Sequence, residues 1–266
     1  RGRNRVNAPI TDTTTIVPFS FNGEKIAAFG GETILQAAKR NGYEIPHLCY
    51  SDNLRADGNC RACMVEIDGE RALAPSCCRQ PNNDMTVRGD SGRARKAQSL
   101  VLELLRGEVG NSHFSNRSEL DYWCDQLEVT GSRFGSRQQP MGDASHPAIA
   151  VNLSACIQCT RCVRACREEQ ANDVIGFAHR GIHSEIVFDL GDSMGESSCV
   201  GCGECVQACP TGALMPAGGV GLEAMDRTVD SVCPYCGVGC LLTYHVKDNR
   251  IQYVTGRDGP SNRGRL

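Results

Sequence analysis

The residues of this sequence that can do chemistry are its cysteines. The 266 residues include 17 cysteines, an odd number, and most of them stand two or three residues apart. Cysteines this close seldom pair with each other, and secreted disulfide scaffolds are usually short chains with an even number of cysteines. Thiolates at such spacing are ligands of metals or iron-sulfur clusters. We therefore expect cysteine ligation in a reducing compartment and not a disulfide framework.

One cysteine pattern occurs twice. Cys156-x2-Cys159-x2-Cys162-x3-Cys166 is repeated as Cys199-x2-Cys202-x2-Cys205-x3-Cys209, and Pro210 follows. Residues 152–217 resemble the bacterial two-cluster ferredoxins, in which the fourth cysteine of each run ligates the other cluster. The resemblance implies one [4Fe-4S] cluster on Cys156, Cys159, Cys162 and Cys209, and another on Cys166, Cys199, Cys202 and Cys205. Two structural zinc sites are the alternative, because zinc sites also use cysteines two residues apart. Zinc would not explain the three-residue spacing before the fourth cysteine or the proline after Cys209.

A third group of cysteines lies in the first hundred residues. It is spaced Cys49-x10-Cys60-x2-Cys63-x13-Cys77, within the phrases Pro-His-Leu-Cys, Gly-Asn-Cys-Arg-Ala-Cys and Pro-Ser-Cys. These phrases resemble the [2Fe-2S] domain at the start of the complex I large subunit and of iron-only hydrogenases. The spacing of plant-type ferredoxins fits less well. The resemblance implies these four cysteines as ligands, and it favours Cys77 over Cys78, which we expect to be a small buried residue.

The last group of cysteines is incomplete. Cys233, Cys236 and Cys240 lie in Cys-Pro-Tyr-Cys-Gly-Val-Gly-Cys, which resembles the loop that opens the catalytic domain of molybdopterin enzymes, especially formate dehydrogenases. In that family a fourth cysteine follows a phrase like residues 256–260. We therefore expect a partial [4Fe-4S] site whose last ligand lies beyond Leu266 in a longer protein. A zinc ribbon would need a second cysteine pair, which the remaining residues do not supply.

One site of the related large subunits is missing from this sequence. Those subunits often carry a histidine followed by three cysteines, which bind a further [4Fe-4S] cluster. The corresponding stretch here has only His113 and Cys124, and we interpret both as ordinary residues. Electrons would then pass between the ferredoxin clusters and the [2Fe-2S] cluster directly, or through clusters on a partner. Three nearby arginines could screen an anionic cluster, but a solvated helix face is the simpler interpretation: Arg161, Arg164 and Arg167.

Short elements must position the first cysteine group. Strands at 16–21 and 25–29 flank Asn22-Gly23, a dipeptide that favours a two-residue hairpin turn. Thr33 can cap a helix that runs through residue 40, and Gly42 ends it. A second hairpin is predicted from strands at 64–67 and 71–74 around Asp68-Gly69.

The remaining elements are predicted from periodicity. An amphipathic helix is expected at 92–106, ended by Gly107, with an apolar face of Ala97, Leu100, Val101, Leu104 and Leu105. A short helix near 120–127 follows. A strand is expected at 182–190, and strands at 241–246 and 250–254 form a hairpin across Asp248-Asn249.

Charge and hydropathy exclude two classes of partner. The net charge is -3 and the basic residues are scattered, so nothing predicts nucleic-acid binding. No apolar stretch is long enough to cross a bilayer, so direct membrane contact is not expected. The basic beginning has no apolar run behind it and is not a secretory signal. These features favour a cytoplasmic location.

Together the groups predict an α+β fold in four parts. These are a β-grasp [2Fe-2S] ferredoxin-like domain at 12–91, a helical connector at 92–147, a bacterial two-[4Fe-4S] ferredoxin domain at 148–226, and the start of a molybdopterin-oxidoreductase cluster domain at 227–266. Nearly the whole chain resembles the large subunit of the cytoplasmic NAD-dependent formate dehydrogenases that use molybdenum or tungsten. No catalytic residue is identified in this sequence.

The resemblance implies an electron relay within a hetero-oligomer. Formate would be oxidised at a Mo or W bis-pterin guanine dinucleotide centre outside this chain. The electrons would pass to a partner subunit that binds FMN and NAD and to its small [2Fe-2S] subunit. The alternatives are the large subunit of NADH:quinone oxidoreductase (complex I) and a diaphorase-type hydrogenase subunit.

Overall fold

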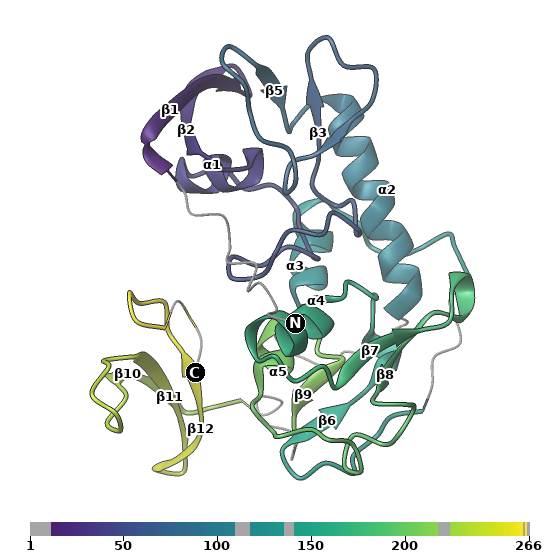
Figure 1. The fold of residues 1–266 in the computed structure, drawn as a ribbon, viewed down its shortest axis with the longest axis vertical. Coiled ribbons are helices and arrows are strands. Elements are labelled where there is room, and N and C mark those ends of the chain that lie inside the picture. Colours follow the sequence, from purple (N-terminus) through teal and green to yellow (C-terminus); the bar gives the residue numbers. More distant parts are fainter. Residues whose placement is uncertain (1–11, 110–117, 136–140, 218–223, 263, 265–266) are drawn as a thin grey trace, which may run out of the picture.

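The fold contains three cysteine-bearing units, of which the first two are joined by helices. The computed structural model describes residues 12–109, 118–135, 141–217, 224–262 and 264. Figure 1 shows the amino-terminal sheet at the top, the duplicated cysteine unit below it, and the carboxy-terminal sheet beside the latter. Among the described residues, no helix combines the length and the apolar character that a bilayer crossing requires.

The amino-terminal unit is a five-stranded sheet with one packed helix. Its strands lie in the order β2-β1-β5-β3-β4, where β1 and β5 are parallel and the other neighbours are antiparallel. The bounds are β1 (Asp12–Phe21), β2 (Glu24–Gly30), α1 (Ile34–Arg40), β3 (Met64–Ile67), β4 (Ala74–Pro75) and β5 (Thr86–Arg88). The first predicted hairpin is confirmed, with positive φ at Asn22 and Gly23. Thr33 caps α1 as expected, in a capping box with Gln36.

The second predicted hairpin is only partly correct. β4 has two residues, which pair with Met64 and Val65, so the strand predicted at 71–74 is mostly loop. The backbone carbonyl of Arg71 instead accepts a hydrogen bond from the side chain of Arg93 at 2.8 Å. The loop is therefore held to the next helix and not to the sheet.

Helices α2 (Gly92–Val109) and α3 (Glu119–Gln126) join the first two units. The predicted end of α2 at Gly107 is wrong, because the helix continues through it. A Cβ at Gly107 would lie 2.6 Å from Ser132 Oγ, so this glycine permits close approach of a neighbouring segment. The predicted inner face is also shifted, since Leu100 and Leu104 are exposed. The buried face of α2 instead contains Ala94, Gln98, Leu102, Gly107 and Val109.

The two helices build a hydrophobic core between the units, called here the junction core. It includes Leu102 from α2 and Leu120, Trp123 and Cys124 from α3. Both cysteine-bearing units contribute to it, and the further members include Leu48, Cys49, Ala62, Ala155, Ile157, Cys159 and Ala213. Burial of this apolar surface fixes the two units against each other.

The duplicated unit contains short elements around its own core. They are β6 (Ile149–Val151), a 3₁₀ turn (Leu153–Ala155), α4 (Arg161–Arg164), a π-helical turn (Ala165–Glu169), β7 (Ile175–Ala178), a second 3₁₀ turn (Gly181–His183), β8 (Glu185–Phe188), α5 (Glu204–Ala208) and β9 (Leu214–Pro216). β6 pairs with β9 and β7 with β8, both antiparallel. The strand predicted at 182–190 is thus shorter than expected, and β7 was not predicted.

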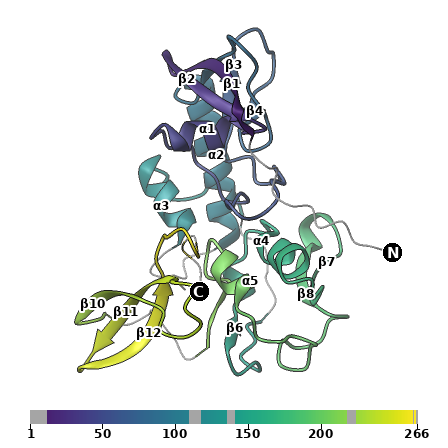
Figure 2. The same cartoon turned by 60° about the vertical axis from the view of Figure 1, so that its left-hand side comes forward.

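The carboxy-terminal unit is a three-stranded antiparallel sheet. Its strands are β10 (Arg227–Val232), β11 (Leu241–Lys247) and β12 (Arg250–Gly256), in that order. The predicted hairpin of β11 and β12 is confirmed, with positive φ at Asp248 and Asn249. β10 was missed because it is almost entirely exposed and lacks a buried face to produce alternation. Figure 1 and Figure 2 both show this sheet beside the duplicated unit.

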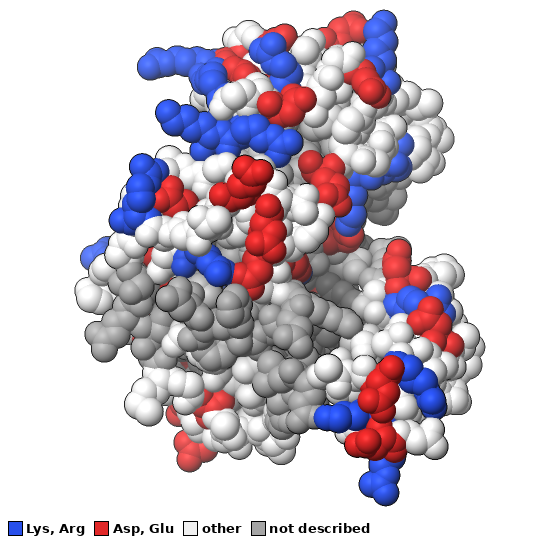
Figure 3. Space-filling model, turned by 180° about the vertical axis from the view of Figure 1, so that it is seen from behind, with Lys and Arg blue, Asp and Glu red and all other residues white. Residues whose placement is uncertain are grey.

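Charged side chains of both signs are interspersed on the surface. Figure 3 shows the face opposite to that of Figure 1, where basic and acidic side chains lie next to one another on the amino-terminal and carboxy-terminal units. Ion pairs such as Arg88 with Asp68 at 2.6 Å and Arg133 with Glu103 at 2.7 Å contribute to this mixture. The described residues of this face form no basic stripe of the kind that would track a nucleic-acid backbone.

Candidate iron-sulfur sites

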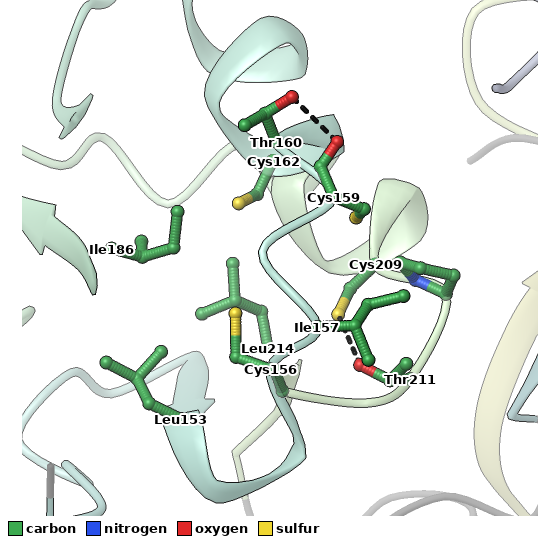
Figure 4. A pocket seen from close by; sticks show the side chains of 12 residues that line it. Leu153, Cys156, Ile157, Cys159, Thr160, Cys162, Ile186, Cys209, Thr211 and Leu214 are labelled. Atoms are coloured by element: carbon green, nitrogen blue, oxygen red, sulfur yellow. Dashed lines mark hydrogen bonds between the residues drawn. The ribbon is translucent and has the colours of Figure 1, made fainter. Parts of the chain in front are cut away.

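The first cavity of the duplicated unit is lined by four thiols from both halves of the repeat. Cys156, Cys159 and Cys162 come from the loop before α4 and its first turn, and Cys209 follows α5. They stand around about 350 Å³ of space not filled by protein atoms, as Figure 4 shows. Apolar side chains complete the wall, among them Leu153, Ile157, Ile186 and Leu214. The structure thus brings together the cysteine set expected for one [4Fe-4S] cluster.

The second cavity repeats this arrangement with the halves exchanged. Cys199, Cys202 and Cys205 line it with Cys166, which lies in the π-helical turn after α4. About 300 Å³ of space here, part of it open to solvent, is not filled by protein atoms, and the apolar wall includes Ile149, Val174, Ile175 and Met194. Cys166 and Cys205 are buried, whereas Cys202 is exposed. This is the other set that the sequence predicted.

The two cysteine loops share one backbone conformation. Positive φ occurs at Gln158 and Thr160 in the first loop and at Gly201 and Gly203 in the second. In each loop the amide two residues after the first cysteine donates to that cysteine's sulfur at 3.4 Å. Such a loop turns successive amides toward sulfur, and amide-to-sulfur hydrogen bonds help to set a cluster's potential. The first loop keeps this shape without glycine, although non-glycine residues seldom adopt positive φ.

Three thiols of these cavities are buried deeply enough that their pKa values are raised. Burial raises the pKa of Cys159 and of Cys205 to about 12, and that of Cys162 well above its usual value. They are therefore protonated at neutral pH until a metal displaces the proton. Within the described ranges, no three His, Cys, Asp or Glu side chains are grouped to hold a single metal ion. Thiols spaced around an open volume fit a cluster.

The amino-terminal cysteines also converge. Cys49, Cys63 and Cys77 are buried and Cys60 is partly buried. The amide of Cys49 donates to Cys60 Sγ at 3.4 Å. Side-chain hydrogen bonds from Cys60 and Cys77 lower the pKa of Cys49, so three of the sulfurs are direct neighbours. Cys63 joins them through a side-chain hydrogen bond from Cys77, which lowers its pKa.

The expectation that Cys78 is buried is wrong. Its side chain is exposed, although its Sγ lies only 3.6 Å from Cys77 Sγ. The amide of Cys78 donates to the carbonyl of Pro75, so both cysteines lie in a tight turn. Gly58 packs against the Cys78 sulfur, where a Cβ would lie 2.8 Å away.

The carboxy-terminal cysteines lie in the loop between β10 and β11. The amide of Cys233 donates to the carbonyl of Cys240 at 2.8 Å and closes the loop, while Cys236 is exposed. The phrase after β12 returns beside this loop, because the amide of Arg257 donates to the carbonyl of Leu241. Asn262 also bonds both backbone groups of Leu241. Residues that follow this phrase therefore start close to the three thiols.

The two residues of the missing cluster site behave differently. His113 lies outside the described residues. Cys124 is buried in the junction core on α3, where burial raises the pKa of its thiol to about 11.

The contact between the first two cysteine-bearing units includes residues that sequence reasoning interpreted wrongly. Arg161 and Arg164 are buried, not part of a solvated helix face, and only Arg167 is exposed, paired with Asp173 at 2.7 Å. Both buried arginines contact the loop of Cys49. Their separation by three residues on a helix was a signal that they share a face. Nothing in the sequence showed which surface that face meets.

The loops themselves also touch across this contact. The Asn59 amide group donates to the carbonyl of Cys159 at 3.3 Å and to Thr160 Oγ1 at 3.1 Å. Thr160 Oγ1 in turn donates to Asp57 at 3.0 Å. The cysteine loop of the amino-terminal unit thus lies directly on that of the first cavity.

Three protein families match consecutive parts of the chain. Residues 14–92 match the 2Fe-2S iron-sulfur cluster binding domain, residues 155–213 the 4Fe-4S dicluster domain, and residues 226–266 the molybdopterin oxidoreductase Fe4S4 domain. These matches agree with the α+β fold and with clusters of both the [2Fe-2S] and [4Fe-4S] kinds.

Similar proteins are subunits of larger oxidoreductases. An NADH-quinone oxidoreductase subunit of Rhizobium meliloti (strain 1021) is 30% identical over 248 residues, which are 90% of this chain and 29% of that protein. An NADP-reducing hydrogenase subunit of Solidesulfovibrio fructosivorans is 33% identical over 215 residues, 76% of this chain and 36% of that protein. The chain is homologous to these oxidoreductase subunits. It spans about a third of their length.

A solved structure extends the homology to the fold. A chain in the crystal structure of NAD+-reducing [NiFe]-hydrogenase in the H2-reduced state superposes with a TM-score of 0.72 at 27% identity. The match covers 78% of this chain and 90% of that one. Neither that hydrogenase nor the two relatives is a formate dehydrogenase by name, so that finer assignment is a proposal.

Proposed function

We propose that this chain is the iron-sulfur electron relay of an NAD-dependent formate dehydrogenase. The observation that carries the proposal is the order of its sites. A [2Fe-2S] domain and a 4Fe-4S dicluster domain are followed by the Fe4S4 domain of molybdopterin oxidoreductases, whose match contains Cys233, Cys236 and Cys240. A relay that precedes a molybdopterin domain is suited to electron transfer: a two-electron oxidation in that domain would deliver electrons to the one-electron sites of this chain.

Each proposed ligand set consists of cysteines whose thiols lie close together in the structure. The amino-terminal set Cys49, Cys60, Cys63 and Cys77 would hold a [2Fe-2S] cluster. The two cavities would hold [4Fe-4S] clusters, on Cys156, Cys159, Cys162 and Cys209 and on Cys166, Cys199, Cys202 and Cys205. When bound, the clusters supply one-electron exchange. The chain's contribution is to hold the thiols, direct amides at sulfur and exclude water.

The partners follow from the same proposal. A Mo or W bis-pterin guanine dinucleotide would bind outside these residues. The fourth ligand of the Cys233, Cys236 and Cys240 site would come from the segment after the phrase at 256–260. The hydrogen bond from the Arg257 amide to the Leu241 carbonyl, next to Cys240, supports this proposal. FMN and NAD would bind to a partner subunit accompanied by a small [2Fe-2S] subunit, in a cytoplasmic hetero-oligomer.

The second candidate is a subunit of NADH:quinone oxidoreductase or of a hydrogenase. The observation in its favour is homology, because the relatives above carry those names. The connector favours formate dehydrogenase over complex I. Cys124 is its only cysteine, and that thiol is packed in the junction core.

Two measurements on the full-length protein with its partners test the assignment. Formate should reduce NAD in the purified complex, and metal analysis should find molybdenum or tungsten. Quinone reduction by NADH, or NAD reduction by hydrogen, without formate activity would overturn the proposal in favour of the second candidate.

Cluster content is tested separately on this chain. Iron and acid-labile sulfide, with EPR of the reduced protein, should reveal one [2Fe-2S] and two [4Fe-4S] centres. Substantial zinc without sulfide would contradict all the ligand sets.

A further inference from the structure

Two buried arginines join the loops that carry the cysteines of the [2Fe-2S] set and of the first cavity. Arg164 on α4 is 3% exposed. Its Nη2 donates to the backbone carbonyls of Cys49 at 2.5 Å and of Cys159 at 3.3 Å, and its Nη1 donates to the carbonyl of Arg55. One guanidinium nitrogen therefore bridges a cysteine of each set.

Arg161 fixes the same loop one helical turn earlier. It is 5% exposed, and its Nη1 donates to the carbonyl of Leu48 at 3.2 Å and to the carboxylate of Glu119 at 2.7 Å. Glu119 begins α3, and its amide donates to the carbonyl of Pro210, next to Cys209. Arg161 thus connects the Cys49 loop, α3 and the far side of the first cavity.

The charge of Arg164 is poorly compensated by carboxylates, whereas Arg161 is paired with Glu119. Arg164 Nε lies 3.9 Å from Asp57, beyond hydrogen-bond distance, and the Nε atoms of both arginines are buried without a hydrogen-bond partner. Burying a cation is costly unless opposite charge or hydrogen bonds offset it. The thiolate ligands gathered on both sides of α4 would supply that opposite charge.

We propose that Arg161 and Arg164 are positioning residues for electron transfer between these two sites. They hold the Cys49 loop against the Cys159 loop, and their positive charge stabilises the reduced state of the neighbouring clusters. The inference rests on the proposed relay function. Clusters held by the amino-terminal cysteine set and by the first cavity would exchange one electron between them, so that the electrons balance without any bond or proton moving.

The test compares four variants of the full-length protein with its partners, loaded with clusters. Arg164→Gln removes the charge, Arg164→Lys keeps the charge but not the fork that reaches three carbonyls, and Arg161→Gln removes the second contact. Arg167→Gln is the matched control, because Arg167 belongs to the same run but is exposed and paired with Asp173. The readouts are EPR-monitored redox titration and the magnetic coupling between the reduced centres.

The expected results separate charge from position. Arg164→Gln and Arg161→Gln should shift the midpoint potentials of the [2Fe-2S] and first [4Fe-4S] centres downward. Arg164→Lys should leave the potentials near those of the unchanged protein but weaken the magnetic coupling and increase amide exchange at residues 45–57. Arg167→Gln should change none of these.

The proposal is overturned if Arg164→Gln and Arg161→Gln match Arg167→Gln in potential and coupling. Arg164→Gln could fail to retain its clusters, and then Arg164→Lys provides the test. If its magnetic coupling and amide exchange equal those of Arg167→Gln, the positioning role is rejected. Dithionite reduces the centres whatever the natural donor is. If the protein does not oxidise formate, the variants can therefore still be compared. If the protein without substitutions contains no clusters, the relay function itself is refuted.

Discussion

At the scale of single residues, the neighbouring thiols Cys77 and Cys78 differ in burial and in the cysteines that they contact. Cys77 is fully buried and contacts Cys49 and Cys63, whereas Cys78 is exposed. We predict that Cys77→Ser loses the [2Fe-2S] EPR signal and its visible absorbance, because serine removes a converging thiolate. Both [4Fe-4S] signals should remain.

Cys78→Ser is the control for this prediction, since it removes an equally small thiol from the next position. It should retain the [2Fe-2S] signal. Loss of the signal in Cys78→Ser and its survival in Cys77→Ser would show that the ligand had been assigned to the wrong cysteine.

At the scale of elements, α2 depends on one glycine for its packing. Alanine at Gly107 gains about 1 kcal/mol of helix propensity, but its Cβ would meet Ser132 Oγ at 2.6 Å and the Phe134 carbonyl at 3.3 Å. Overpacking of this kind costs about 1–3 kcal/mol. We therefore predict that Gly107→Ala lowers the apparent Tm by about 2–4 °C, measured by thermal scanning.

Gly92→Ala tests the same substitution at the start of α2, where no atom lies within 4 Å of the new Cβ. It should leave the apparent Tm unchanged or slightly raised. Adding Ser132→Ala to Gly107→Ala should recover part of the loss. An equal or higher Tm for Gly107→Ala alone would mean that the neighbouring segment moves away without cost.

At the scale of the whole molecule, the units differ in what stabilises them. The amino-terminal sheet has an apolar core that includes Phe19, Phe21, Ile34 and Leu35. The duplicated unit has α4 and α5, of four and five residues, which are too short to be stable alone. Cysteines of the proposed sets belong to both cores, but only the duplicated unit lacks longer elements around them. We predict that removal of iron by chelation increases amide exchange most at residues 156–167 and 199–209.

The strands β1 and β2 serve as the internal reference for this measurement, because they carry no cysteine and pair with each other along most of their length. Their amides should keep most of their protection after chelation. Equal loss in both regions, or no loss in the duplicated unit, would contradict the idea that clusters hold that unit together.

The parts of the fold that sequence predicted are those set by local chemistry. Asn22-Gly23 and Asp248-Asn249 form hairpin turns because their backbones tolerate positive φ, and Thr33 caps α1 through its own side chain. The parts missed depend on distant contacts. Glycine often ends helices, which is why an end is predicted at Gly107, but the segment at Ser132 requires this glycine inside one. β10 lacks any buried periodicity from which to predict it.

The same distinction between local sequence and distant contacts applies to the cysteine sites. Motifs of the sequence, through their resemblance to known cluster domains, were enough to predict which thiols come together in the two cavities and in the amino-terminal group. Only the tertiary structure decided how the sites meet. It buries Arg161 and Arg164 against the Cys49 loop and places Asn59 on Cys159, since these contacts join residues about a hundred positions apart. Packing and the compensation of buried charge depend on such neighbours, and no local spacing encodes them.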